Sequence, residues 1–134
     1  MGIEPRKFSL RDRAKSFVFA FRGLRLMLVT QHNAWLHAFF TICVTIAGLA
    51  VGLNVPEWCW ITLAIVAVWT AEALNTAFEF LCDVASPEFH PLVEKAKDVA
   101  AGAVLISAIG AGIIGLLVIG PRLATLIQHS PPGH

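Results

Sequence analysis

Residues 99–121 read VAAGAVLISAIGAGIIGLLVIGP and contain no Asp, Glu, Lys or Arg. A helix needs about 20 mainly apolar residues to cross the hydrocarbon core of a bilayer. This stretch meets that length without interruption and therefore predicts a membrane-spanning helix. We expect the helix to begin near Leu92 and to end near Leu126, with a cluster of charged residues in its first turns and an apolar body.

Two more stretches, 26–56 and 58–71, also lack charged side chains. The first is long enough to hold a second span. The stretch 58–71 reaches the required length only by extending through Glu72 toward Asp83. This span therefore carries acidic residues, which are energetically costly within the bilayer. We expect a short turn of Asn54, Pro56 and Glu57 to separate the two spans.

The composition agrees with a membrane protein. The chain is 57% hydrophobic and 14% charged, whereas soluble domains are about 45–50% apolar and about 25% charged. The expected fold is an all-α integral membrane protein with three transmembrane helices and an N-terminal amphipathic surface helix, forming one unit over 1–128 before a disordered tail at 129–134. The expected helices cover about 9–28, 34–53, 58–83 and 92–126.

The N-terminal helix is predicted from its cap and its periodicity. Ser9 and Asp12 have the spacing of a capping box, and apolar residues then recur every three or four positions on one face. Arg and Lys lie mostly on the other faces, which is typical of a helix that lies on a membrane surface. An amphipathic helix packed on protein is the alternative.

Charge distribution predicts the orientation. The formal net charge is only +1, which gives no reason to expect a nucleic-acid partner. The Lys and Arg residues are concentrated in the N-terminal segment, two lie in the 84–98 segment, and the turn near residue 55 has none. The positive-inside rule therefore places the N-terminus and the second loop in the cytoplasm.

An acidic face is the most informative feature of the middle span. Asn75, Glu79 and Asp83 follow Glu72 at offsets that place each of them within about 60° of Glu72 on one helix face. Such a face can be a polar seam between helices, with its carboxyls bonded to Asn33, His37 or Lys97. It can also be a site, because carboxylates bind divalent cations and accept protons from alcohols.

A second polar cluster, at 88–98, crosses the second loop and enters the last span. Lys97 and Asp98 lie where a helix meets the headgroup layer, and a Lys ammonium there can hold phosphate. Snorkelling of Lys toward water is the alternative. The chain has no P-loop, GxGxxG or kinase HRD pattern, so a nucleotide site here must be of another kind.

Two motifs in these segments, EALNTAFE at 72–79 and AKDVAAGAV at 96–104, resemble the signatures of the small prokaryotic membrane lipid kinases, the diacylglycerol kinase and undecaprenol kinase family. The resemblance extends from Lys15 to the end of the last span. It implies a homotrimer with sites between subunits. It also implies transfer of the ATP γ-phosphoryl group, with Mg²⁺, to a membrane lipid alcohol, undecaprenol or diacylglycerol, at the cytoplasmic face.

The resemblance also implies residue roles. Glu72 would be the general base with Asn75 as its orienting partner, and Glu79 would hold the metal on the nucleotide. Arg25 and Asn33, together with Glu72, would contact the lipid substrate. The residues expected to bind or support the nucleotide are Lys97, Asp98, Glu88, His90, Phe19 and Asp83.

One position departs from the family pattern. The segment QHNAWLH at 31–37 matches a motif that begins with Glu, a second metal ligand, and here the residue is Gln31. Its carbonyl oxygen can still coordinate a cation, but the negative charge is absent. The alternative function is therefore a catalytically weak or silent homologue that binds lipid or nucleotide. A small oligomeric ion or proton pathway is a third possibility, suggested by the intramembrane acids alone.

Overall fold

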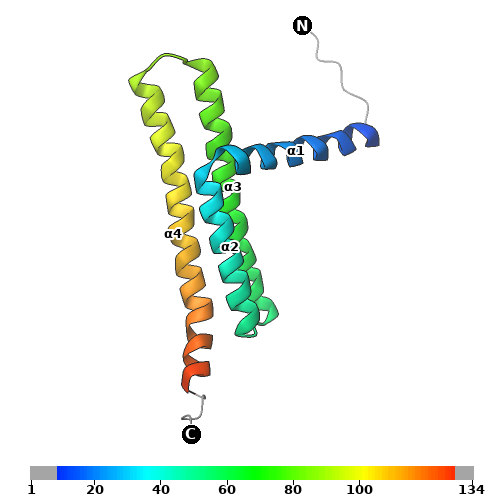
Figure 1. Ribbon diagram of the computed structural model, residues 1–134, viewed down its shortest axis with the longest axis vertical. Coiled ribbons are helices and arrows are strands. Elements are labelled where there is room, and N and C mark those ends of the chain that lie inside the picture. Colours follow the sequence, from blue (N-terminus) through cyan, green and yellow to red (C-terminus); the bar gives the residue numbers. More distant parts are fainter. Residues whose placement is uncertain (1–8, 129–134) are drawn as a thin grey trace.

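The computed structural model describes residues 9–128, and all regular structure within that range is helical. The expected tail at 129–134 lies outside it. Three long helices form an elongated bundle, and the N-terminal helix projects sideways from it (Figure 1). The helices are α1 (Leu10–Thr30), α2 (His32–Ala50), α3 (Val55–Ala85) and α4 (Pro91–Gln128).

The three predicted spans are confirmed as helices, since α2, α3 and α4 are each long and apolar enough to cross a membrane. Most large apolar side chains on them are exposed in the single chain, including Ile106 at 73% and Leu116 at 75%. Such a surface requires an apolar environment. The structure is therefore that of an integral membrane protein. The membrane-surface position of α1 remains a prediction.

The helices are joined by short connections. Only Gln31, with an extended backbone, separates α1 from α2. This single residue changes the chain direction, so that α1 leaves the bundle (Figure 1). Beyond the level of α1, the end of α3 and the start of α4 continue as a helical hairpin (Figure 1).

The turn between α2 and α3 lies earlier in the chain than the sequence suggested, at residues 51–54. Pro56 and Glu57, expected in the turn, lie in the first turn of α3, because Asn54 caps that helix in a reciprocal capping box with Glu57. A proline is tolerated there since its missing N–H would have no helical partner. Gly52, with φ of 66°, makes the reversal possible.

The tightest packing lies near this turn. α3 and α4 share the most extensive interface, and α2 packs mainly against α3. Leu53, Ile61 and Ile119 form the buried cluster. The opposite half of the bundle holds Glu72, Asn75, Glu79 and Asp83 of α3, so the apolar cluster anchors the helices at the end away from this acidic face.

Candidate active site

The junction of α1 and α2 contacts the acidic face of α3 through Gln31. Its Nε2 donates to Oε2 of Glu79 at 2.9 Å, and Nδ2 of Asn75 donates to Oε1 of the same carboxylate at 3.1 Å. Gln31 can reach α3 because its extended backbone ends one helix and begins the next. Both carboxylate oxygens of Glu79 are therefore held in place by amide groups.

Two turns further into the bundle from Glu79, the side chain of Glu72 is completely buried. Neither of its carboxylate oxygens has a hydrogen-bond partner in the described structure. The nearest cation-forming group is His37 of α2, whose Nε2 lies 3.7 Å from Oε2. The neighbouring Thr76 hydroxyl donates to the backbone carbonyl of Glu72 and gives nothing to its carboxylate. Glu72 is thus an acceptor without a donor.

Asn75 is oriented differently from the expectation. Its side-chain amide donates to Glu79, and the structure gives it no hydrogen bond to Glu72. Its Oδ1 is buried and has no partner in the described structure. The geometry therefore makes Asn75 an orienting partner of Glu79, while its free oxygen stays available to another donor.

At the end of α3, Lys97 of α4 donates to the carboxylate of Asp83. The Asp83 side chain is 63% exposed, so the acidic face passes from full burial at Glu72 to solvent. This pair joins α3 to α4 beside the hairpin loop.

The other residues expected to bind the nucleotide lie around this loop. Asp98, Glu88 and His90 are all exposed. The Nδ1 of His90 accepts the backbone N–H of Leu92 at 3.2 Å and so supports the start of α4. These side chains form an open polar surface next to Lys97.

Three further expected residues lie apart from this network. Phe19 and Arg25 are exposed on α1, and Asn33 is exposed at the start of α2. The Arg22 guanidinium, which the sequence analysis did not single out, stacks 5.8 Å from the centre of the Phe19 ring. In the described residues no hydrogen bond or ion pair connects Phe19, Arg25 or Asn33 to the acidic face of α3.

Two of the three contacts expected for a polar seam between helices are present. His37 lies beside Glu72, and Lys97 is paired with Asp83. Asn33 makes no such contact in the described structure. A seam alone would satisfy its buried polar atoms, because an unpaired buried group is costly. The unpaired atoms of Glu72, His37 and Asn75 therefore point to a site as well as a seam.

The residues present can hold a nucleotide-bound Mg²⁺ only with help from the nucleotide. No group of three or more His, Cys, Asp and Glu side chains suited to a metal occurs among residues 9–128. Mg²⁺ on a nucleotide usually takes one or two carboxylates together with phosphate oxygens and water, and Glu79 fits that role. Gln31 presents its amide nitrogen to Glu79, so its side chain must turn over before its oxygen could face a metal.

A bundle of helices long and apolar enough to cross a membrane, with a buried carboxylate, an exposed carboxylate and a lysine towards one end, defines an integral membrane protein with a polar site at that end of its bundle. The chain belongs to the prokaryotic diacylglycerol kinase family, whose model matches residues 18–119. It is a membrane lipid kinase.

Curated relatives cover most of the chain. It is 43% identical over 123 residues to an undecaprenol kinase of Bacillus subtilis, covering 92% of this chain and 100% of the relative. It is 35% identical to a diacylglycerol kinase of Synechocystis, covering 84% of this chain and 65% of the relative. It is 31% identical to a diacylglycerol kinase of Helicobacter pylori, covering 76% of this chain and 85% of the relative.

Proposed function

We propose that this kinase transfers the γ-phosphoryl group of ATP to the hydroxyl of a membrane lipid alcohol, with undecaprenol as the preferred acceptor. The observation that carries the reaction type is Glu72, a fully buried carboxylate with both oxygens free of hydrogen bonds. The preference for undecaprenol is supported by the relative of that name, which matches over its whole length at higher identity than the two diacylglycerol kinases.

In this reaction Glu72 acts as the general base. The acceptor hydroxyl oxygen forms the new bond to the γ-phosphorus, the bond from that phosphorus to the ADP oxygen breaks, and the hydroxyl proton passes to a Glu72 oxygen. A carboxylate free of hydrogen bonds has its lone pairs available for that proton. Burial near the membrane boundary lets it meet an alcohol that stays in the bilayer.

Glu79 is the proposed metal ligand, and Gln31 is the weaker second ligand once its amide has turned over. When bound, Mg²⁺ neutralises charge on the nucleotide phosphates. Asn75 keeps the Glu79 carboxylate in a fixed orientation through its 3.1 Å hydrogen bond. The metal position therefore depends on the contact between the α1–α2 junction and α3.

The nucleotide is proposed to lie over the open surface beside the α3–α4 loop. Lys97 would exchange its partner Asp83 for a phosphate oxygen, because its ammonium can swing between the two. Asp98, Glu88 and His90, which are exposed, would help to place the nucleotide at the outer edge of this surface. On α1, Phe19 would stack on the nucleotide, whereas Arg25 would contact the lipid, as would Asn33 at the start of α2.

A homotrimer with sites shared between subunits remains part of the proposal. The large exposed apolar surfaces of α2, α3 and α4 would support it, since neighbouring helices and lipid together could cover them. Facing the cytoplasm of the bacterial inner membrane, the N-terminus and the α3–α4 loop would meet soluble ATP. This orientation rests on the basic residues near the N-terminus.

The experiment is a phosphorylation assay with purified protein in mixed micelles. Undecaprenol, diacylglycerol and ceramide are supplied separately with γ-labelled ATP and Mg²⁺. We expect label in undecaprenol first, and we expect Glu72→Gln to lower the rate by about 10²–10⁴-fold, the usual contribution of a general base. No label in any lipid from correctly assembled wild-type protein would instead favour the catalytically weak or silent homologue.

A further inference from the structure

The side chain of His37 faces the buried carboxylate of Glu72 from the neighbouring helix. Its Nε2 lies 3.7 Å from Oε2 of Glu72, the imidazole is 11% exposed, and the carboxylate is fully buried. Neither group has a hydrogen-bond partner in the described structure. Two unpaired polar groups thus face each other across the α2–α3 interface.

We propose that His37 is the positioning residue of the phosphoryl-transfer site: its Nε2–H donates to one oxygen of Glu72, keeps that carboxylate ionised and leaves the other oxygen to receive the proton. This inference rests on the proposed function, in which Glu72 is the base. It gives a role in positioning the base to His37, for which the sequence indicated only a contact in a polar seam.

The need for a donor follows from the burial of Glu72. A carboxylate that has lost its water is strongly destabilised unless another group donates to it, and a neutral acid cannot accept a proton. The other polar side chains nearby are already engaged. The Thr76 hydroxyl donates to the backbone, and the Asn75 amide donates to Glu79.

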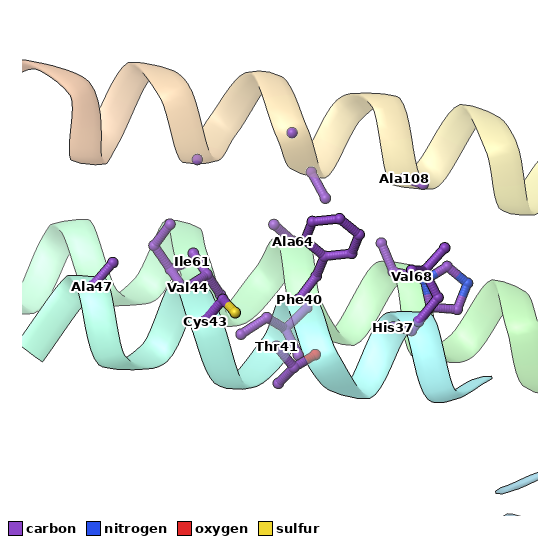
Figure 2. Close-up of a pocket in the computed structure, with 15 residues that line it drawn as sticks. His37, Phe40, Thr41, Cys43, Val44, Ala47, Ile61, Ala64, Val68 and Ala108 are labelled. Carbon is purple, nitrogen blue, oxygen red and sulfur yellow. The ribbon is translucent and has the colours of Figure 1, made fainter. Parts of the chain in front are cut away.

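The surroundings of His37 leave Nε2 with no better acceptor. The imidazole lies at one end of a groove of about 540 Å³ between α2, α3 and α4, whose lining is almost entirely apolar (Figure 2). Thr41, the other side chain with an oxygen there, accepts the indole N–H of Trp69 at 3.1 Å. The Glu72 carboxylate is therefore the available acceptor for the His37 N–H.

The present separation is slightly longer than a hydrogen bond, for which nitrogen and oxygen approach to about 2.7–3.2 Å. Hydrogen bonds of catalytic groups are often long before substrate binds and shorten in the loaded site. Both side chains are on neighbouring helices that already contact each other, so we infer that the gap between them closes when substrate binds. The donor then fixes which Glu72 oxygen faces the acceptor hydroxyl.

The test compares two replacements of His37. The amide nitrogen of Gln in His37→Gln can reach the place of Nε2 and donate, whereas His37→Leu removes the donor while keeping an apolar side chain. We expect His37→Leu to lower kcat by about tenfold to a hundredfold, as for one lost hydrogen bond to a charged group. We expect His37→Gln to recover kcat to within about threefold of wild type, with the KM for ATP unchanged in both.

Thr41→Val is the matched control. It removes the acceptor of the Trp69 indole at the same α2–α3 interface, one turn away from His37. We expect it to lower thermal stability and to leave kcat unchanged. Infrared spectra give a readout independent of turnover: His37→Leu should show a new band of a protonated carboxyl that is absent when Glu72→Gln is added.

The outcomes separate this inference from the proposed function. If wild-type protein transfers phosphate and Glu72→Gln is about 10²–10⁴-fold slower but still measurable, the function stands. Within that result, a wild-type kcat in His37→Leu, or equal losses in the Leu and Gln variants, would overturn the role of His37. An additional loss when His37→Leu is placed in the Glu72→Gln protein would overturn it too, because residues that act as a unit are not additive. Glu72→Gln at full activity would overturn both.

Discussion

The Nε2 of Gln31 donates to Oε2 of Glu79 at 2.9 Å, and this contact attaches the start of the first span to the acidic face of the second. A carboxylate in place of Gln31 could not donate and would repel Glu79. The departure at Gln31 that the family resemblance implies thus replaces a pair of acids by an acid and a donor. The contact stabilises the site without metal and reduces the charge available to hold one.

Gln31→Glu should lower the magnesium requirement of lipid phosphorylation by about tenfold, roughly the effect of one added charge interaction near a protein surface. The apparent KM for the nucleotide should fall as well, while the lipid dependence changes little. Without metal the variant should be less stable, because two adjacent carboxylates repel. The measurement is transfer rate against magnesium concentration, with Gln31→Ala as the control that adds no charge. Superimposed curves for wild type and Gln31→Glu would place the metal elsewhere.

Glu79→Ala should lower lipid phosphorylation about a hundredfold or more, since it removes the carboxylate assigned to the metal. It also leaves the amides of Gln31 and Asn75 without their acceptor. Raised magnesium should recover part of the activity. Glu94→Ala, which removes an exposed carboxylate from the first turn of α4, is the control and should titrate like wild type. A normal magnesium curve for Glu79→Ala contradicts its assignment as the ligand.

The three spans could be predicted from sequence because each depends only on the spacing of charges along the chain. That the acidic residues share one face of α3 could also be predicted, since helix periodicity places Glu72 and Asp83 on the same side. Its burial was not, because burial depends on which helices cover it: Glu72 is fully enclosed and the Asp83 side chain is 63% exposed. The meeting of His37 with Glu72 likewise depends on how α2 packs on α3, which periodicity does not determine.

Gly48→Ala should destabilise the folded chain by about 1–3 kcal/mol, the usual effect of overpacking a tight interface. A Cβ at this position would lie 2.9 Å from Leu53 Cδ1 and 2.9 Å from Trp58 Cη2, closer than real Cβ contacts, so these side chains would have to shift. Gly110→Ala is the matched control, because a Cβ there meets nothing within 4 Å. Unfolding in detergent with increasing denaturant measures both. Equal stability of the two variants would mean that Gly48 does not hold the α2–α3 turn against α3.

The last prediction concerns the end of the bundle away from the site, where Arg122 of α4 pairs with Glu57 of α3. The guanidinium donates through Nε and Nη2 to both oxygens of the carboxylate, each at 3.0 Å. Glu57 also closes the capping box of α3 with Asn54, so one carboxylate supports a helix start and a helix–helix contact. A bidentate pair of this kind is more specific than a single surface contact.

Glu57→Gln separates these two functions, because Gln can still complete a capping box but cannot form the ion pair. We expect Glu57→Gln and Arg122→Met each to lower the free energy of unfolding. The double variant should be as stable as the less stable of the two single variants, because either change alone already removes the ion pair. Glu57→Ala should be less stable than Glu57→Gln, since it also loses the cap. Lipid phosphorylation below the unfolding range should stay at the wild-type rate in Glu57→Gln, because the site lies at the other end of α3. Strictly additive effects in the double variant would show that the two side chains are not coupled.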